Sequence, residues 1–502
     1  MCENQANSPN WLSPQTLISK NRNIRTKRRD NLCLLIEPES ASWAVLPPDS
    51  LSFWSALPKV CTWEQAMHLD HPFPSTKRSQ ILLEFYRRNF INANGRYYLN
   101  ADKIFARSTT YPHFICFHIT EACNLACRYC MADSLPDKAA MPLDTYKFII
   151  GKVLRELPNQ GFTIDFHGGE PMLAFDKIVA AINYTEQLNR QENLGKELYY
   201  SFQTNGTLLN KENIKRLLEL PNLRIGLSLD GPQEVQDKNR VFAGPDPKHG
   251  SFQKVIENFH LAREMGLYLG VLGVIHQPQD YLKSCKFFAE TLKIDSFRLN
   301  YSSYIGRSAK LLDFSLDRAE EFAKYWLEMI DYAYNYAKEH DICFNISDIN
   351  NQINNLIRKE RNFMCYRSPC GAGNSVFGFA IDGGIHACEE MASSGACRLG
   401  NIFDPKLNLK DLIDSSPLVR QLNERNVNNI PKCSRCPYRR FCTGGCTSKA
   451  LAFFGTFKRE SPMCGYYQKV FEGLMWRLYK HPDLVHYLGG CELQQVNFRP
   501  FA

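Results

Sequence analysis

The chain has 502 residues, a formal net charge of +8, and 44% hydrophobic and 22% charged residues. This length predicts two to four domains at about 150 residues each, and the composition excludes disordered and collagen-like chains. The small positive charge gives no indication of a nucleic-acid partner. The 19 cysteines are too sparse for a small disulfide scaffold, and clustered cysteines in a reducing compartment more often hold metal than form disulfides.

The N-terminal segment carries no export signal. Residues 1–15 are polar, where a secretory signal needs a continuous apolar core. No stretch reaches the ~18 uninterrupted apolar residues of a membrane-spanning helix. We therefore expect a cytoplasmic protein without a membrane partner.

Residues 1–30 are expected to form a flexible basic arm, because Lys and Arg are frequent toward its end. Residues 31–105 predict a separate winged-helix-like α+β domain. Its expected elements are strands at Leu32–Ile36 and Ser42–Leu46, three helices, and a final strand at Gly95–Leu99.

Strands and helices then alternate over residues 110–345. The six expected strands are Phe114–Ile119, Phe162–His167, Leu198–Gln203, Leu223–Leu229, Tyr268–Ile275 and Ser296–Tyr301. This alternation predicts an α/β fold with a parallel sheet curled into a partial (β/α)6 barrel of the TIM type. Its functional site is expected at the carboxyl ends of the strands. A cysteine-rich region over residues 360–470 and a C-terminal helix and tail over 471–502 complete the chain.

A cysteine triplet follows the first expected strand of the barrel. Cys123, Cys127 and Cys130 form a C-x3-C-x2-C pattern. Three thiolates on one short loop do not complete a tetrahedral zinc site. They can hold three corners of a four-iron cluster and leave the fourth iron open to another ligand.

This triplet, with Tyr129 as its aromatic residue, resembles that of the radical S-adenosylmethionine (SAM) enzymes. The resemblance extends to Gly168-Gly169-Glu170 after the second strand, and it implies that this segment binds SAM. In the sulfatase-maturase branch, the residues matching Ser228 and Arg240 contact the ribose and carboxylate of SAM. A solvated surface position for Arg240 is the alternative.

The late cysteines have a pattern of their own, C-x2-C-x5-C-x3-C from Cys433 to Cys446. It resembles the SPASM extension, which holds two auxiliary [4Fe-4S] clusters. The resemblance implies one cluster on Cys365, Cys370, Cys388 and Cys446, and another on Cys433, Cys436, Cys442 and Cys464. Cys397 is an alternative to Cys365. A zinc ribbon on Cys433, Cys436, Cys442 and Cys446 is the competing interpretation.

The cysteines outside these sets, among them Cys116 and Cys285, are expected to be small buried hydrophobic residues. His167 is expected to be a packing or hydrogen-bonding strand residue and not a ligand.

The resemblance implies an oxidoreductase with three [4Fe-4S] clusters that uses SAM and a flavodoxin- or ferredoxin-type electron donor. One cluster would reduce SAM to a 5′-deoxyadenosyl radical, which removes hydrogen from a substrate carbon. We expect the substrate to be a ribosomally synthesised peptide, and the product to be a thioether or carbon–carbon crosslink.

Two alternatives differ in substrate or in class. A sulfatase maturase, which forms formylglycine from Cys or Ser, usually has an Asp after the cysteine that matches Cys388. This chain has Glu389 there, which could act as the catalytic base. The remote alternative is a zinc-binding scaffold without enzymatic activity.

The pattern of residues 31–105 resembles the leader-recognition domain of peptide maturases. In those domains the leader of the precursor adds a strand to an exposed sheet edge. The resemblance therefore implies a precursor-peptide partner bound by the N-terminal domain.

Overall fold

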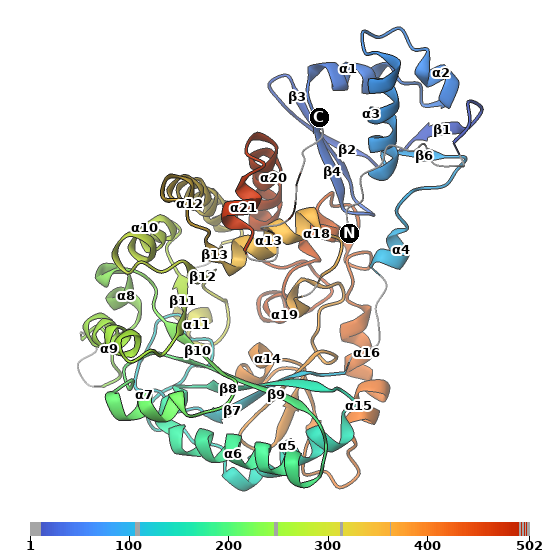
Figure 1. Ribbon diagram of the computed structural model, residues 1–502. Helices are drawn as coiled ribbons and strands as arrows, with labels where there is room; N and C mark the ends of the chain where they lie inside the picture. Colours follow the sequence, from blue (N-terminus) through green and yellow to red (C-terminus); the bar gives the residue numbers. More distant parts are fainter. Residues whose placement is uncertain are drawn as a thin grey trace.

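The computed structural model describes residues 12–105, 111–244, 249–311, 315–361, 363–490, 493, 496 and 498. It contains one ten-stranded sheet and two three-stranded sheets (Figure 1). The ten strands lie in the order β13-β12-β11-β10-β9-β8-β7-β14-β15-β16. None of the described helices is both long and apolar enough to cross a membrane.

Six parallel strands form the centre of this sheet. They are β7 (Phe114–Thr120), β8 (Gly161–Gly168), β9 (Glu197–Thr204), β10 (Leu223–Ser228), β11 (Leu269–Ile275) and β12 (Ser296–Tyr301). All six agree with the strands expected from the sequence to within two residues at either end. The predicted α/β class and the parallel sheet are confirmed.

Helices follow these strands and cover the outer face of the sheet (Figure 1). They are α5 (Leu143–Glu156), α6 (Phe175–Gln191), α7 (Lys211–Leu218), α8 (Gln233–Asn239), α9 (Phe252–Glu264), α10 (Asp280–Lys286) and α12 (Arg318–His340). The short helix α11 (Arg307–Leu311) instead lies inside the curve of the sheet, against the loop after β7. Alternate strand residues such as Ile115 and Phe117 are buried in one large core with the outer helices. Phe117 packs on Tyr146 of α5, with ring centroids 4.6 Å apart.

The opposite face of the same strands is polar. Because side chains alternate along a strand, Cys116 and His118 of β7 point away from the helices, as do Asp165 and His167 of β8. These residues therefore line the inside of the curved sheet, at the place where a barrel enzyme has its site.

The cysteine-rich region is built onto the main sheet. β14 (Val376–Phe379) runs parallel to β7, and β15 (Gly384–His386) and β16 (Arg398–Asn401) extend the edge beyond it. β13 (Asn345–Ile346) extends the other edge. The remaining helices are α13 (Ser347–Ile357), α14 (Glu389–Ser393), α15 (Leu409–Ser415), α16 (Pro417–Glu424), α17 (Pro431–Ser434), α18 (Arg439–Cys442), α19 (Thr447–Phe454), α20 (Cys464–Lys480) and α21 (Leu484–Leu488).

Two expected boundaries are therefore wrong. The barrel and the cysteine-rich region share one sheet, and the boundary at residue 471 lies within α20. This helix begins at Cys464 and packs against α12, so the last expected ligand and the C-terminal helix are one element.

The N-terminal segment is more ordered than expected. β1 (Leu17–Lys20) pairs with β5 (Val60–Thr62) and β6 (Ile91–Ala93). β2 (Arg25–Arg29), β3 (Leu32–Glu37) and β4 (Ser42–Leu46) form the second small sheet. The flexible arm is thus wrong for residues 17–29, because ladder hydrogen bonds fix the basic strand while its side chains stay in water. Residues 1–11 lie outside the described part.

The helices of this region are α1 (Pro48–Ala56), α2 (Trp63–Met67), α3 (Ser75–Arg87) and α4 (Ala101–Ile104). The strand expected at residues 95–99 is wrong. Within this segment only Arg96 makes a β-bridge, with Ala93. The backbone of Leu99 is instead bound by the side-chain amide of Asn89, which donates to Leu99 O and accepts from Leu99 N at 2.8 Å each. The side chain of Asn89 thus makes the hydrogen bonds that a neighbouring strand would make.

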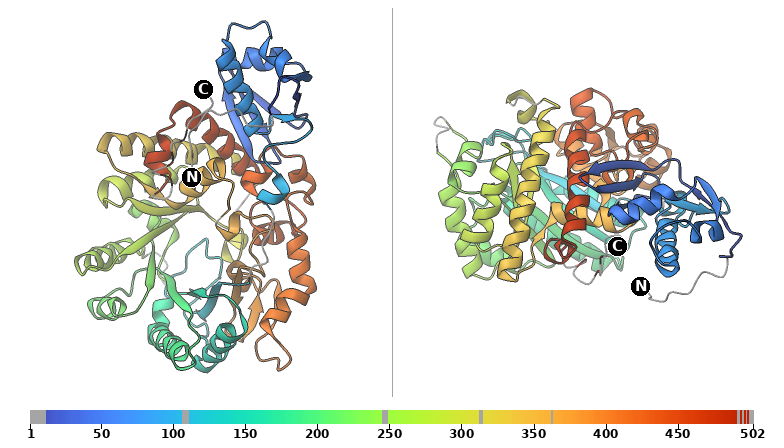
Figure 2. Two further views of the ribbon diagram at one scale, coloured as in Figure 1. Left: turned by 45° about the vertical axis from the view of Figure 1, so that its right-hand side comes forward. Right: turned by 90° about the horizontal axis from the view of Figure 1, so that it is seen from above.

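The N-terminal domain packs against the rest of the chain, beside α20 (Figure 2). Leu34, Trp43 and Val45 belong to the main core and not to the domain's own core. The indole nitrogen of Trp43 donates to the backbone oxygen of Leu356 at 2.9 Å. The domain is therefore not separate, because one face of its sheet is buried in the body.

Candidate functional site

The triplet Cys123, Cys127 and Cys130 lies on the loop that follows β7, at the carboxyl edge of the parallel sheet. Backbone hydrogen bonds join this loop to the end of α8 and to the segment after it: Arg128 N donates to Asn239 O at 3.0 Å, and Ala126 N donates to Val241 O at 2.8 Å. The loop is thus held in place at the edge that barrel enzymes use.

Burial raises the pKa of Cys123 to about 12 and that of Cys127 to about 11. Both thiols are therefore protonated in the protein without metal. Bound iron would offset this cost, because a coordinated thiol is deprotonated by the charge of the metal.

The two glycines of the Gly168-Gly169-Glu170 segment permit a close approach of backbones. A Cβ on Gly168 would lie 2.0 Å from Thr120 O, and one on Gly169 would lie 2.0 Å from Ala122 O. Gly169 N instead donates to Thr120 O at 2.7 Å. The two glycines thus let the backbone at the end of β8 lie directly against the start of the cysteine loop. A side chain at either position would collide with that loop.

Glu170 is buried and makes three hydrogen bonds. Its Oε1 accepts from Thr204 Oγ1 at 2.6 Å and from Met172 N at 3.0 Å, and its Oε2 accepts from Asn205 N at 2.7 Å. Asn205 in turn donates to Asn124 of the cysteine loop at 2.8 Å. Glu170 therefore joins the ends of β8 and β9, and Oε2 has acceptor capacity left for an amine.

Arg240 lies in the interior and not at the surface. Its Nε donates to Asp230 Oδ1 at 3.1 Å, and both side chains are buried. Tyr129 donates to Asp230 Oδ2, and its ring lies 5.3 Å from the Arg240 guanidinium. The solvated position for Arg240 is thus wrong, because Asp230 neutralises its charge in the interior.

Asp230 is a residue that sequence reasoning did not assign. It also accepts from Val274 N at 2.9 Å, so it joins β10, β11 and the segment after α8. Its place after the fourth strand was the signal that could have identified it. Ser228, two residues earlier, accepts a hydrogen bond from Gln203 at 3.1 Å.

Arg307 was also missed. Its guanidinium donates to the backbone oxygens of Cys127 and Ser134 and to Asp133 Oδ1, at 2.7 to 3.0 Å. Because its partners are mostly backbone atoms nearly 180 residues away, no local sequence pattern indicates this role.

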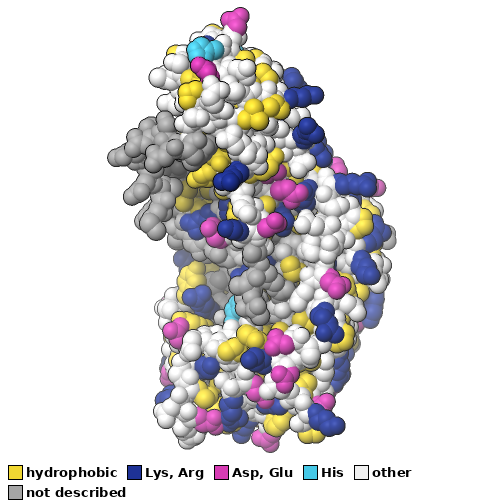
Figure 3. All heavy atoms as spheres, turned by 90° about the vertical axis from the view of Figure 1, so that its right-hand side faces the viewer, with side chains coloured by type: hydrophobic (Ala, Val, Ile, Leu, Met, Phe, Trp, Pro, Cys, Tyr) yellow, Lys and Arg dark blue, Asp and Glu magenta, His cyan; other side chains and the backbone are white. Residues whose placement is uncertain are grey.

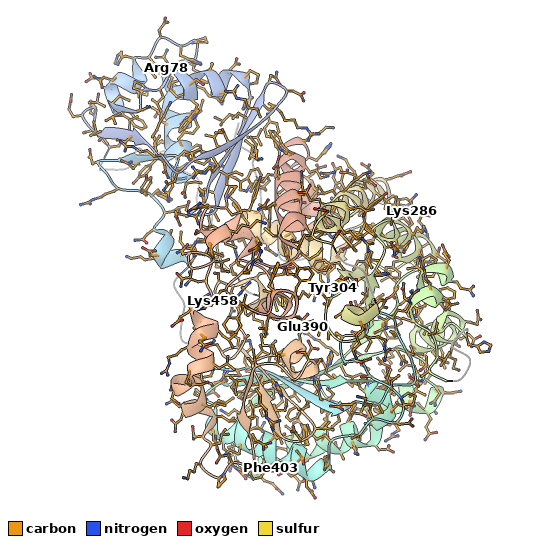
Figure 4. The ribbon with its side chains drawn as sticks, turned by 180° about the vertical axis from the view of Figure 1, so that it is seen from behind. Arg78, Lys286, Tyr304, Glu390, Phe403 and Lys458 are labelled. Atoms are coloured by element: carbon orange, nitrogen blue, oxygen red, sulfur yellow. The ribbon has the colours of Figure 1, made fainter. Side chains whose placement is uncertain are left out.

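Among the cysteines expected for one auxiliary cluster, Cys370, Cys388 and Cys446 are partly buried near α14 and α19, whereas Cys365 is exposed. Cys446 Sγ lies 3.2 Å from Glu390 Oε2, and Cys370 Sγ lies 2.9 Å from Thr447 Oγ1. Burial raises the pKa of Cys446 well above its usual value, with Glu390 and Cys365 adding to the effect. Figure 4 shows Glu390 near the centre of the molecule.

Cys365 and Cys397 compete for one place in this group. The thiols of Cys370 and Cys446 both interact electrostatically with Cys365. Burial raises the pKa of Cys397, and Cys370 is the one thiol that adds to it. Cys397 packs in one apolar cluster with Cys370 and Cys388, so the choice between Cys365 and Cys397 stays a prediction.

The second auxiliary group lines a single pocket, whose cysteines are Cys433, Cys436, Cys442 and Cys464. Gln468 of α20 lies 3.6 Å from the sulfur atoms of both Cys436 and Cys464. Cys446 is not part of this lining. The structure therefore does not group the four cysteines as the zinc-ribbon interpretation requires.

Sulfur spacing argues against zinc as well. Among the described residues, no three of these cysteines have sulfur atoms within 4.8 Å of one another. A tetrahedral zinc site would place its sulfurs about 4 Å apart, given Zn–S bonds of about 2.3 Å. A four-iron cluster holds them farther apart, because each cysteine binds a different iron.

Glu389 begins α14 and points into the barrel. Its Oε1 lies 3.3 Å from His167 Nε2. Burial raises the pKa of Glu389 to about 7, while His167 lowers it and Glu390 raises it. The side chain of Glu389 is thus largely buried; its role as a catalytic base stays a prediction.

Residues 117–287 match the family model of the Radical SAM superfamily. Over 368 residues the chain is 25% identical to a cysteine-type anaerobic sulfatase-maturating enzyme of Clostridium novyi. The aligned region covers 70% of this chain and 91% of that enzyme. The chain is also 26% identical over 357 residues to an uncharacterized protein of Archaeoglobus fulgidus, covering 70% of this chain and 78% of the relative.

Two solved structures share the fold. The native sulfatase-maturating enzyme anSMEcpe with bound AdoMet has a TM-score of 0.62 and 22% identity, and the match covers 74% of this chain and 99% of that one. SuiB of Streptococcus suis has a TM-score of 0.51 and 17% identity, and the match covers 88% and 98%. The chain thus contains a segment of the Radical SAM superfamily at residues 117–287, and it is similar to the anaerobic sulfatase-maturating enzymes over 70% of its length.

Proposed function

We propose that this radical SAM enzyme oxidatively crosslinks a ribosomally synthesised peptide that binds at its N-terminal domain. The observation that carries the proposal is a pocket of about 300 Å³ at the outer edge of β4. The pocket lies between β4, α3 and the end of α13, so an edge strand, a helix and the enzyme body meet there.

The edge of β4 is suited to an added strand. Among the described residues, β4 pairs with β3 alone, and its residues 42–44 line the pocket. A peptide strand that adds to such an edge gains main-chain hydrogen bonds, and neighbouring pockets select its side chains.

The charges around this pocket favour an acidic peptide. Arg87, Arg88 and Lys359 line it together with a single acidic residue, Glu84. Figure 3 shows Lys and Arg side chains on the N-terminal domain and near its junction with the body. The apolar floor includes Trp43, so an acidic segment with an apolar side chain is the fitting ligand class.

The cofactor residues fit the radical chemistry of the family. Cys123, Cys127 and Cys130 would hold the [4Fe-4S] cluster, with Glu170 and Arg240 beside it for SAM. When bound, these groups supply the abstraction of a hydrogen atom from an unreactive carbon. The protein orients the loop and buries the charged pair of Arg240 and Asp230 beside it.

Two auxiliary clusters are proposed on the two further cysteine groups, with Cys365 preferred to Cys397. Each crosslink removes two hydrogen atoms, that is two protons and two electrons, from the peptide. The first would leave as a hydrogen atom by abstraction, and the second as a proton, with its electron passing to an auxiliary cluster. The residues that hold this cluster would thus allow the electron to return to the flavodoxin- or ferredoxin-type donor.

Formylglycine formation is the second candidate, favoured by the Clostridium novyi relative and by the position of Glu389. A structure of anSMEcpe is described with bound AdoMet and the Cp18Cys peptide. In this candidate, Glu389 would take the proton of a substrate Cys or Ser, since its carboxylate faces the barrel interior.

The deciding experiment uses anaerobic enzyme, SAM, a reductant and a short precursor peptide encoded beside the gene. Mass spectrometry should show the loss of two hydrogen atoms per bond formed. Exchange of a cysteine sulfur for a carbonyl oxygen, in that peptide or in a sulfatase peptide, would instead establish formylglycine formation.

A charge-reversal pair tests the pocket. We expect Arg87→Glu to raise KM for the acidic peptide about tenfold or more, with SAM cleavage in the absence of peptide unchanged. Lys410→Glu on α15 is the matched control, because Lys410 lies in another part of the chain. Equal KM for both variants would exclude the pocket as the peptide site.

A further inference from the structure

Three potential metal ligands meet on the inner face of the barrel, apart from the cysteine groups above. Cys116 and His118 stand on β7, and His167 stands on β8. His118 and His167 are direct partners in the strand register. One ligand atom of each of the three residues lies within 4.8 Å of the other two, and this is the one such group among the described residues.

One buried polar atom at this place has no partner among the described residues. His167 Nδ1 is buried and makes no hydrogen bond, whereas Glu389 Oε1 lies 3.3 Å from His167 Nε2. A buried polar group without a partner costs about 1–3 kcal/mol. The free ring nitrogen of His167 is therefore available to a ligand that the protein alone does not supply.

We propose that Cys116, His118 and His167 bind one divalent transition-metal ion, Zn²⁺, with a fourth, oxygen ligand beside Glu389. One thiolate and two imidazoles are a ligand set that zinc takes readily. The thiolate and the nearby carboxylate of Glu389 balance the two positive charges, so the buried site is neutral. This assignment replaces the reading of Cys116 and His167 as ordinary strand residues.

The surroundings are those of a supported metal site. His118 Nε2 lies 3.5 Å from Ser393 Oγ, on the opposite element α14. Asp165 Oδ2 lies 3.8 Å from Cys116 Sγ, and Asp165 Oδ1 accepts a 2.6 Å hydrogen bond from Ser201. Such outer partners fix the orientation of metal ligands.

The position of the ion gives it a task distinct from that of the clusters. It would join β7 and β8 of the barrel to α14, which begins directly after Cys388. The ion thus fixes the inner wall of the barrel against the segment of an auxiliary cluster, and it polarises a bound water or substrate group beside Glu389.

The test uses the full-length enzyme with its clusters reconstituted anaerobically and Zn²⁺ then added as the probe. Elemental analysis should find about one zinc per chain after gel filtration. Zinc-edge X-ray absorption should show one sulfur at ~2.3 Å and three nitrogen or oxygen atoms at ~2.0–2.1 Å. Neither readout depends on SAM cleavage or on a peptide substrate.

Cys116→Ala and His167→Gln should lower zinc to below about a tenth per chain while the iron content is unchanged. Cys285→Ala is the matched control, since Cys285 is an equally buried free thiol on α10. If Cys116→Ala does not fold, His167→Gln gives the same test, because its side chain is 23% exposed.

Three results overturn the proposal. The first is a zinc content below about a tenth of an ion per chain in the wild type, and the second is equal zinc content in the His167→Gln variant and the control. The third is a zinc ion bound by four sulfur atoms, because that would show zinc in the place of a cluster.

Discussion

Arg307 Nη1 donates a hydrogen bond of 2.8 Å to the backbone oxygen of Cys127. Arg307 follows β12, whereas Cys127 follows β7, and these strands lie at opposite ends of the six-stranded run. The peptide nitrogen of Arg307 also donates to Cys130 O at 2.9 Å. One residue thus joins the two ends of the open barrel directly behind the cysteine loop.

Replacing Arg307 should loosen the loop of the radical SAM cluster. We expect Arg307→Ala to lower iron from about 12 to about 8 per chain, because one four-iron cluster becomes labile. Arg307→Lys should restore little, since lysine lacks the planar fork that serves several acceptors. Iron and sulfide analysis after anaerobic gel filtration checks this.

Lys310→Ala is the control for Arg307→Ala. Lys310 binds the same Asp133 at 2.8 Å, but its side chain is 69% exposed and it does not contact the loop backbone. If both variants keep all their iron, Arg307 does not hold the loop.

Asp230→Asn should destabilise the fold through the buried Arg240. Removing one partner of a buried ion pair leaves an uncompensated charge and costs about 3–5 kcal/mol. Asp176→Asn is the control. Asp176 pairs with Arg216, but the side chain of Asp176 is 88% exposed, and such surface pairs contribute about 0–1 kcal/mol. Chemical denaturation of the two variants measures the difference, and equal midpoints would contradict the role of Asp230.

Iron content can separate the two cysteines that compete for one auxiliary cluster. Cys365→Ala should lose about four iron atoms of about 12, whereas Cys397→Ala should keep them all. The reason is that Cys365 interacts with both Cys370 and Cys446. The opposite result would assign the place to Cys397, and a loss in neither variant would leave that cluster with three cysteine ligands.

The barrel was predictable because each of its strands has a local pattern of its own. Apolar residues alternate with polar ones along β8, and turn residues bound each strand, so chain order alone defines the alternation. The cysteine groups were predicted from the resemblance of their spacing to a known family. Cys433, Cys436, Cys442 and Cys464 line one pocket, and the membership of the other group stays a prediction.

Residues that act through distant partners were not predictable. Asp230 and Arg307 have roles only once the strands are side by side, and Cys116 meets His167 only through strand register. The error about the N-terminal region has a similar cause. Trp43 lies on a strand that was expected to belong to a separate domain, but the sequence of a strand does not show which neighbour covers each of its faces.

The last prediction concerns this covered face. Trp43 is buried against the body: its indole donates to Leu356 O, and its ring centroid lies 6.0 Å from that of Phe498. Lys359 reaches back to the backbone oxygens of Ser40 and Ala41, at 2.9 and 2.7 Å. Contacts therefore cross the junction from both sides.

Removing residues 1–105 should consequently expose an apolar face of the body and lead to aggregation, because large apolar patches are rare on monomers. Within the full chain, Trp43→Ala should cost about 3–5 kcal/mol and loosen the junction. Trp54→Ala is the control, since Trp54 packs on Phe85 and Phe90 of the domain's own core. Limited proteolysis should then release the N-terminal domain as an intact fragment from the Trp43 variant. In the Trp54 variant the domain itself should unfold, so the protease should degrade it. A truncated chain that stays monomeric, with full iron content and SAM cleavage, would show instead that the body needs no cover from this domain.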